Sequence, residues 1–452
     1  MNGENRSKSS DTSDQGSHSQ DKPNGLARAD WKQVFLLGLA MKLGGCSMAW
    51  NYGLITGFWE YFIAVMVVGI GYLMLGLCMA EMVSIMTFDG GYYGYARVIL
   101  GPLGGYLVGC SGLMESIFYF ADYPMKIAQF LEVCFNINSG ANQLIWLITY
   151  VVLVILMVLC CRYFWQIISI YTMMVIVLML IYLFGSIPSL NFQHYALINH
   201  SVGFHNDPNL FLDIFRLSVV FFIGFDLLTL ITSEVKESKK TMPYAMLGLI
   251  VTMLVLALWL MFTVASQPPG VTEQLYQEST YFPLVFGYMR IFKIGYKSAS
   301  AIAAFPMMGT SVVYMYIIAR QIKSMASSGL LPHALNCTIN LQGEDVPVVA
   351  YLVVCLIAYA ANYFALTVNI YTTCTRAATT AGCFVYLSMF YCYVVFKKRF
   401  GHCERTLKNP LGIFSAVIGS VIFGTILVMM LVFHPEFKAV PILYAIFMTV
   451  ML

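Results

Sequence analysis

Charged residues are scarce in this chain of 452 residues: Asp, Glu, Lys and Arg together make up 10%, whereas the apolar set makes up 59%. A soluble domain carries about 25% charged residues, so this composition cannot cover the surface of a soluble protein of this size. Soluble enzymes, nucleic-acid binders and disordered scaffolds are therefore excluded. The net charge of +3 is too small to indicate an anionic partner.

The cysteines and histidines are not arranged as a metal or redox site requires. The twelve cysteines show no CxxC spacing, and the seven histidines all fall in the tail, in loops or at helix ends. We expect the cysteines to be packing residues and predict no metal site, no disulfide framework and no organic cofactor. With no nucleophile motif either, the chain is not predicted to be an enzyme.

Apolar stretches of about 20 residues, long enough to cross a bilayer, follow one another from Trp31 onward. The predicted fold class is an all-α polytopic membrane protein with about 12 transmembrane helices. The predicted helices cover residues 33–57, 60–86, 103–136, 142–161, 165–188, 212–235, 243–266, 297–325, 347–364, 368–396 and 410–433. A twelfth begins near Val440 and stops at Leu452, so the chain either ends in a partial helix or is cut there.

Three segments are expected along the chain. Residues 1–30 are polar, have no apolar h-region and are typical of a disordered tail, not of a signal peptide. Residues 31–396 form the predicted ten-helix transport core, and residues 397–452 hold helix 11 and the partial helix 12.

The distribution of Lys and Arg predicts the orientation. With the N-terminus in the cytosol, the cytosolic segments hold 17 of these residues and the outer segments hold five. This bias follows the positive-inside rule and predicts a multi-pass protein with a cytosolic N-terminus, with the plasma membrane as the favoured location. The sequon at Asn199 then faces outward, where glycosylation is possible.

Helix 1 carries a glycine pair, Gly44 and Gly45, followed by the polar residues Cys46, Ser47 and Asn51. Paired glycines lower the cost of leaving the helix, so that backbone groups can face a binding cavity. They are equally typical of a close packing face between membrane helices. The glycines alone do not separate these interpretations, but the polar residues beyond them favour a site.

Helix 6 carries a second glycine beside polar groups, in the run Phe222, Ile223, Gly224, Phe225 and Asp226. Helices 1 and 6 lie five helices apart and therefore run in opposite directions. Interrupted helices at corresponding positions of two halves indicate the midplane binding site of an inverted-repeat transporter.

A few charged residues lie deep in the predicted helices, where a carboxylate costs several kcal/mol unless it is paired, solvated or protonated. Asp226 is a functional candidate for this reason, with a structural ion pair as the alternative. Glu115 lies near mid-depth without a local partner, whereas Asp122 and Lys126 are spaced i,i+4 and predict a local pair. These residues, with Lys42 and Arg376, sum to zero charge, as expected if they pair in one polar interior.

Four stretches together resemble the amino acid–polyamine–organocation transporter superfamily, nearest its ethanolamine permease-like branch. They are Gly44–Leu54, Ala80–Met82 continuing through Asp89–Arg97 and Leu100–Gly105, Phe222–Asp226 continuing to Glu234–Pro243, and Arg320–Ile322 with Ser328–Pro332. In order and spacing the resemblance covers residues 33–433. Three features depart from the family pattern: bulkier residues follow the glycine pair, Val220 stands where an aromatic gate is usual, and helix 5 contains no Lys.

The resemblance implies two inverted five-helix repeats with broken helices 1 and 6, and secondary-active transport of amino acids or related small amines by alternating access. The resemblance implies either symport with H+ or Na+ or exchange of substrates. The expected substrate-binding residues are Gly44, Gly45, Cys46, Ser47, Asn51, Glu115, Phe222, Gly224, Phe225 and Asp226. The candidates for ion coupling are Asp226, Glu115, Lys42, Thr310 and Ser311.

Two other interpretations of function remain open. One is a transporter-like nutrient sensor without net flux, against which the short tail argues, and the other is a permease specific for ethanolamine or polyamines. The expected partners are a small amine or amino acid substrate and the lipid bilayer. The exact substrate, the coupling ion, symport or exchange, and the oligomeric state are not determined by the sequence.

Overall fold

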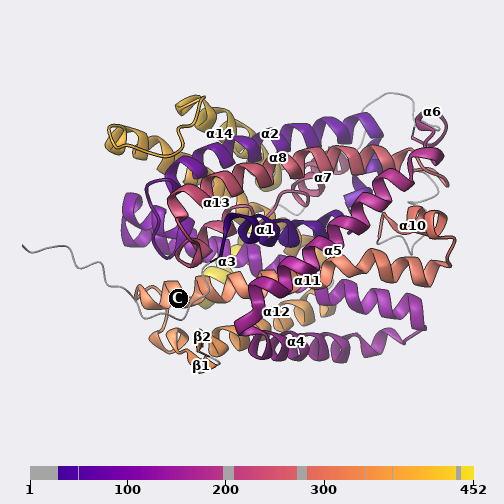
Figure 1. The fold of residues 1–452 in the computed structure, drawn as a ribbon, viewed down its shortest axis with the longest axis horizontal. Helices are drawn as coiled ribbons and strands as arrows, with labels where there is room; N and C mark the ends of the chain where they lie inside the picture. Colours follow the sequence, from indigo (N-terminus) through magenta and orange to yellow (C-terminus); the bar gives the residue numbers. More distant parts are fainter. Residues whose placement is uncertain are drawn as a thin grey trace, which may run out of the picture.

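The computed structural model describes residues 29–48, 50–196, 208–271, 282–341, 343–368, 370–433 and 439–451. It is a bundle of long helices that run along one axis, with α1 in the middle (Figure 1). Most of the predicted tail and the sequon at Asn199 lie outside the described residues. The predicted all-α polytopic fold class is confirmed.

The helices that correspond to the predicted transmembrane segments are apolar over most of their circumference, as expected for helices packed against lipid and against one another. They are α1 (Trp31–Cys46) with η1 (Trp50–Thr56), α2 (Phe58–Val83), α3 (Gly91–Phe135), α4 (Asn142–Leu159), α5 (Phe164–Gly185), α7 (Pro208–Val219) with η5 (Asp226–Glu234), α8 (Ser238–Ala265), α11 (Tyr296–Ser327), α12 (Val348–Thr367), α13 (Tyr371–Phe400), α14 (Ile413–Val428) and α15 (Ala439–Met451). In this order they are helices 1 to 12.

Among the described residues, nine helices are long and apolar enough to cross a membrane without interruption. Helices 1 and 6 are absent from that set because each is broken into two short pieces, and α15 is absent because it has 13 residues. The difference from the predicted twelve therefore has a structural cause.

The element α3 consists of two helical stretches joined at a kink, where Gly101 has a non-helical backbone with φ of 86° and ψ of −179°. Pro102 begins the second stretch, close to the predicted start of helix 3 at residue 103. Glycine tolerates this φ, and proline is favoured at the start of a helix. The first stretch, which begins at Gly91, was not predicted as a helix. Short elements also occur in the expected loops.

These short elements lie at the ends of the bundle. They are η2 (Ser139–Ala141), η3 (Cys161–Tyr163), η4 (Ile187–Ser189), α6 (Phe192–Tyr195), α10 (Val285–Phe292), η6 (His333–Asn336) and an antiparallel hairpin of β1 (Ile339–Leu341) and β2 (Glu344–Val346). A π-helical turn, Met429–Phe433, continues α14.

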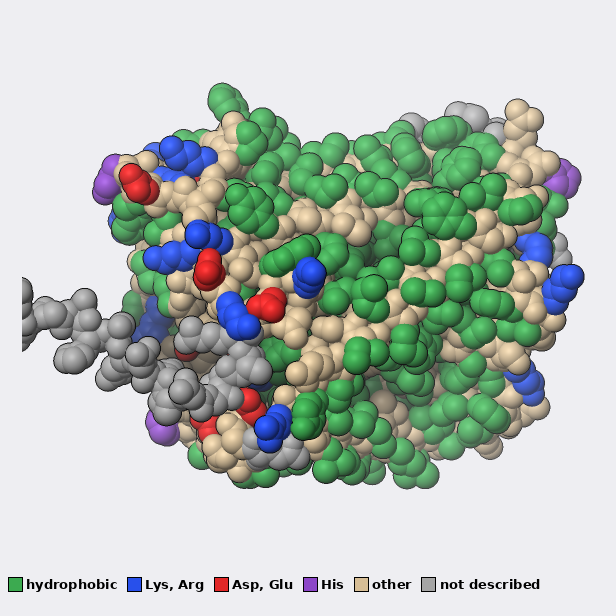
Figure 2. All heavy atoms as spheres, viewed as in Figure 1, with side chains coloured by type: hydrophobic (Ala, Val, Ile, Leu, Met, Phe, Trp, Pro, Cys, Tyr) green, Lys and Arg blue, Asp and Glu red, His purple; other side chains and the backbone are tan. Residues whose placement is uncertain are grey.

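The surface of the bundle divides into an apolar middle and two polar ends. Figure 2 shows a broad hydrophobic band, with Lys and Arg gathered mainly at the left end and fewer at the right end. Ala29 forms a parallel bridge with Val235, just beyond η5. Ala29 N donates to Glu234 O at 2.9 Å, and Lys236 N donates to Ala29 O at 3.0 Å.

Candidate functional site

The break in helix 1 lies between the end of α1 at Cys46 and the start of η1 at Trp50. Ser47 caps α1, with its hydroxyl donating back to Leu43 O at 3.2 Å. The indole Nε1 of Trp50 donates to Cys46 O at 2.7 Å, so a side chain satisfies one of the carbonyls left open at the helix end. Cys46 and Ser47 are fully buried.

Gly44 and Gly45 lie in the last turn of α1, before the break and not within it. A Cβ on Gly44 would lie 2.7 Å from Cβ of Thr310, and a Cβ on Gly45 would lie 2.8 Å from Val220 O. These distances are too short for a methyl group, so the glycines allow α1 to touch helices 6 and 8 directly. The glycine pair thus packs closely against these helices, and its part in a substrate site stays a prediction.

Thr310 of α11 holds α1 in this position. Its hydroxyl donates to Ala40 O at 2.6 Å and accepts from Gly44 N at 3.0 Å. Ser311, the next residue, donates within its own helix to Met307 O at 2.9 Å. Thr310 and Ser311, the two hydroxyl residues among the five ion-coupling candidates, therefore both make hydrogen bonds to protein groups.

The break in helix 6 lies between the end of α7 at Val219 and the start of η5 at Asp226. Gly224 has a φ of 77°, in the left-handed region that favours glycine. A Cβ at this position would also lie 2.7 Å from the hydroxyl oxygen of Tyr314 in α11. The glycine is thus required both for the turn and for the close approach of helix 8.

Lys42 of α1 connects the two broken helices. Its ammonium donates to Phe222 O at 2.8 Å and to Ile223 O, two carbonyls of the helix-6 break. The side chain is only 2% exposed. A cation is favourable at this place because the carbonyls that follow α7 lack helical partners and carry partial negative charge.

Asp226 begins η5 and is fully buried, yet neither of its carboxylate oxygens has a hydrogen-bond partner among the described residues. Its charge interacts with that of Lys42. Buried polar groups are normally hydrogen-bonded, so an unpartnered carboxylate at a helix break indicates a position for a ligand or a proton.

Glu115 of α3 supplies a second buried carboxylate, whose charge interacts with those of Lys42 and Asp226. One oxygen accepts a hydrogen bond from the Tyr386 hydroxyl of α13, and the other has no partner among the described residues. Tyr72 of α2 donates to Tyr386 at 3.1 Å. Gly382 leaves room for this carboxylate, because a Cβ there would lie 2.7 Å from Glu115 Cδ.

Aromatic side chains surround these polar groups. Trp50 and Phe221 bring the two breaks together, with ring centroids 5.0 Å apart, and Phe222 stacks on Tyr72 at 5.4 Å. Asn51 lies just beyond Trp50, is 2% exposed and has no hydrogen-bond partner for its side-chain amide in the part of the chain described. Its amide is a second buried polar group available to a ligand.

Phe225 is fully buried but packs toward Gly76 of α2, where a Cβ would lie 3.3 Å from the phenyl ring. The structure therefore brings together Lys42, Glu115, Phe222 and Asp226, whereas Phe225 lies on the packing side of helix 6.

The expectation that all deep charges share one interior was wrong. Arg376 of α13 pairs with Asp213 of α7 at 3.0 Å, so it does not belong with Asp226 and Glu115. Asp122 accepts from the Tyr371 hydroxyl at 2.6 Å, and the Lys126 ammonium lies 5.4 Å from the centre of the same ring. The deep charges thus form an inner group around Asp226 and an outer group near Asp213 and Asp122.

The sequence analysis did not identify the buried tyrosines that lie beside the inner group of charges. Tyr72, Tyr314 and Tyr386 are fully buried. The Tyr386 hydroxyl donates to Glu115, the Tyr72 hydroxyl donates to Tyr386, and the Tyr314 hydroxyl donates to Ile223 O at the helix-6 break. Buried tyrosines in otherwise apolar helices are a usable signal, since a buried hydroxyl requires a partner. No group of three or more His, Cys, Asp or Glu residues that could hold a metal ion occurs among the described residues.

The helical architecture and the two broken helices define an all-α, multi-pass membrane protein. A profile of the family described as amino acid permease matches residues 33–449, and the chain belongs to this family. The predicted resemblance to the superfamily is confirmed at this level, while the ethanolamine permease-like branch stays a prediction. No curated protein sequence matches the chain in a direct comparison.

Proposed function

We propose that the chain is a secondary-active transporter that carries amino acids or related small amines by alternating access. The observation that supports this most directly is the carboxylate of Asp226, which is fully buried and unpartnered at the start of η5. An ammonium group is the ligand that such a carboxylate binds best, because it supplies both charge and hydrogen-bond donors.

The charge balance around Asp226 supports the same substrate class. The inner group holds two carboxylates, Asp226 and Glu115, and one ammonium, Lys42, whose donors already reach the carbonyls of the helix-6 break. With both carboxylates ionised the group carries one excess negative charge. A cationic amine, or a proton, would cancel it.

Ion pairs on either side of Asp226 support alternating access. On one side Asp213 of α7 pairs with Arg376 of α13. On the other side Glu234 of η5 accepts hydrogen bonds from Arg320 and Tyr316 of α11. Helix 6 therefore contacts helix 10 before the break and helix 8 after it, and opening one contact at a time would expose Asp226 to one side at a time.

Coupling to protons is the part of the proposal that the buried carboxylates support. The unpartnered oxygens of Asp226 and Glu115 are the groups that can gain or lose a proton.

Uptake of labelled amino acids and amines into proteoliposomes tests the proposal. The wild-type protein should accumulate a substrate with an amino group when a pH gradient is imposed. Asp226→Asn keeps the shape and removes the charge, so it should fold and lose most of this uptake. Asp345→Asn is the matched control and should retain transport, because it makes the same substitution at an exposed carboxylate of β2.

Binding without flux in the wild type would show a sensor and contradict the transport proposal. Wild-type rates with an unchanged pH profile in Asp226→Asn would show that this carboxylate is structural. In that case a loss of uptake in Glu115→Gln, tested in parallel, would assign amine recognition to Glu115.

A further inference from the structure

A group of basic side chains lies at the end of the bundle that is expected to face the cytosol. It comes from the C-terminal end of α13, from the loop before α14 and from the start of α8. Its exposed members, which we call the basic rim, are Lys239, Lys398, Arg399 and Lys408. In the described part of the chain none of the four makes an ion pair.

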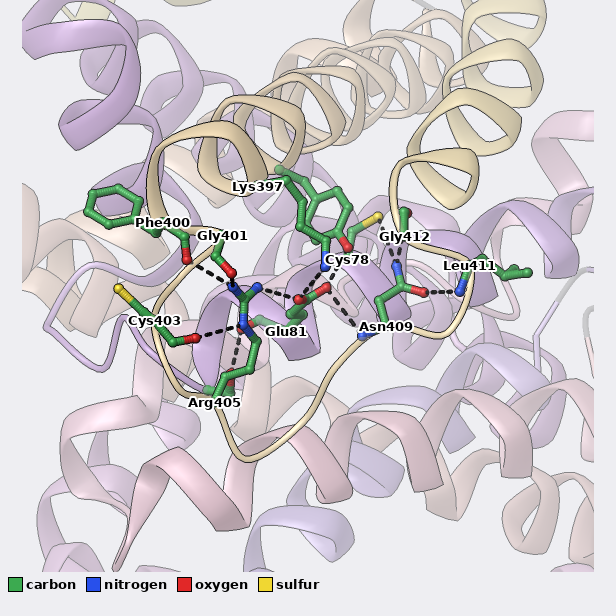
Figure 3. Close-up of polar contacts among 12 residues, drawn as sticks. Cys78, Glu81, Lys397, Phe400, Gly401, Cys403, Arg405, Asn409, Leu411 and Gly412 are labelled. Atoms are coloured by element: carbon green, nitrogen blue, oxygen red, sulfur yellow. Dashed lines mark hydrogen bonds and ion pairs between the residues drawn. The ribbon is translucent and has the colours of Figure 1, made fainter.

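The loop that carries part of the rim is held in place by a buried carboxylate, Glu81 of α2 (Figure 3). Glu81 is fully buried and accepts from Lys397 at 2.7 Å, from Arg405 and from the backbone N–H of Asn409 at 3.2 Å. Arg405 also donates to Phe400 O at 2.8 Å. These bonds fold the loop back onto the end of α13.

A further hydrogen bond ties the loop to helix 7, since the Thr406 hydroxyl donates to Lys239 O at 2.6 Å. The backbones that carry the four rim residues are therefore fixed relative to one another. The inward-facing Lys397 and Arg405 share the single carboxylate of Glu81, whereas the rim residues keep their positive charges at the surface. Ordered backbone of this kind reduces the entropy lost when a ligand binds.

Exposed apolar side chains continue directly from the rim. Tyr244 is 61% exposed one turn after Lys240 on α8, and Phe414 is 75% exposed at the start of α14. Side chains of this kind on membrane helices face lipid, which places the rim at the level of the headgroups. Figure 2 shows the same arrangement, with Lys and Arg at the left end bordering the hydrophobic band.

We propose that the basic rim binds the phosphate groups of anionic phospholipids in the cytosolic leaflet. The cytosolic leaflet carries negative surface potential, and clusters of Lys and Arg next to a transmembrane helix are attracted to it. A soluble anion would gain only from the charges. A lipid gains from the charges and, through its acyl chains, from the apolar side chains beside them.

Native mass spectrometry of the full-length protein, titrated with phosphatidylserine or phosphatidylcholine, tests the proposal. We expect phosphatidylserine to be retained preferentially and its retention to weaken at higher ionic strength. Lys398→Gln/Arg399→Gln should lower the affinity for phosphatidylserine roughly 25-fold, at about five-fold per removed charge. Lys239→Gln/Lys408→Gln is a second variant with the same expectation.

The matched control is Lys293→Gln/Lys297→Gln, which removes two exposed lysines from the opposite end of the bundle. It should leave phosphatidylserine binding unchanged. An equal loss in this control would show a response to net charge alone and overturn the proposal, as would equal retention of phosphatidylcholine. Binding of glycerophosphoserine, which lacks acyl chains, as tightly as phosphatidylserine would identify a soluble-anion site instead.

Folding of the variants is checked by their thermal midpoints in phosphatidylcholine, which should match the wild type because the substituted side chains are exposed. Amine uptake in phosphatidylcholine vesicles should also match it. Failure of the lipid proposal therefore leaves the transport proposal intact, and the reverse also holds.

Discussion

Replacing Lys42 with Met should destabilise the protein by about 2–6 kcal/mol. The methionine keeps the length of the side chain but removes an ammonium that donates to Phe222 O and Ile223 O. Each of these two buried carbonyls, left without a donor, costs about 1–3 kcal/mol. Asp226 also loses the positive charge of Lys42, which acts on its carboxylate.

A double-mutant cycle separates the two costs. Asp226→Asn removes the charge that Lys42→Met leaves uncompensated, so the double variant should be less destabilised than the sum of the two single variants. We expect a coupling energy of about 0.5–3 kcal/mol, the range found for residues that share one charge network. The two carbonyls remain without donors in the double variant, which should therefore stay below the wild type.

The assay is a denaturant titration of each purified protein in detergent, with the thermal midpoint as a second readout. Lys293→Met is the control, because it replaces an exposed lysine at the end of the bundle. A Lys42→Met protein within about 1 kcal/mol of the wild type would refute the bridging role of this ammonium. Strictly additive single effects would refute its interaction with Asp226.

Three further predictions concern packing, the buried acid and topology. Gly44→Ala should lower stability by about 1–3 kcal/mol through overpacking against helix 8, whereas Gly424→Ala, with no atom near the added Cβ, should be neutral or stabilising in the same melting assay. Glu81→Gln should cost about 3–5 kcal/mol, because it leaves a buried guanidinium without its carboxylate; an unchanged melting temperature would contradict this. A cysteine at Ser201 should react with an impermeant thiol reagent applied to intact cells, and one at Ser238 should not; the reverse pattern would overturn the orientation.

Much of the fold could be predicted from hydropathy, because uninterrupted apolar stretches of membrane length have few alternatives to a helix. The breaks were also predictable, since Gly224 beside Asp226 marks a place where a helix can open. The exact position of the helix-1 break was not predictable. Gly44 and Gly45 are used for contact with helices 6 and 8, and the chain leaves the helix only after Cys46.

The partners of the deep charges could not be read from the sequence either. The sequence places both Arg376 and Asp226 deep within predicted helices, but Arg376 pairs with Asp213, which lies 163 positions away in the chain. Such pairings depend on which faces of the helices meet, and hydropathy does not encode this. Likewise, the net charge of +3 gave no sign of the basic rim, because a total does not show where charges gather.

The backbone bridge at Ala29 gives the start of the described chain a mechanical link to the site. Two hydrogen bonds join this residue to Glu234, the last residue of η5, and to Lys236 just beyond it; η5 begins with Asp226. Any rigid displacement of η5 either pulls residue 29 with it or breaks both bonds. The distance between residue 29 and the neighbouring helices would therefore change when the second half of helix 6 moves, and measuring it would report that movement.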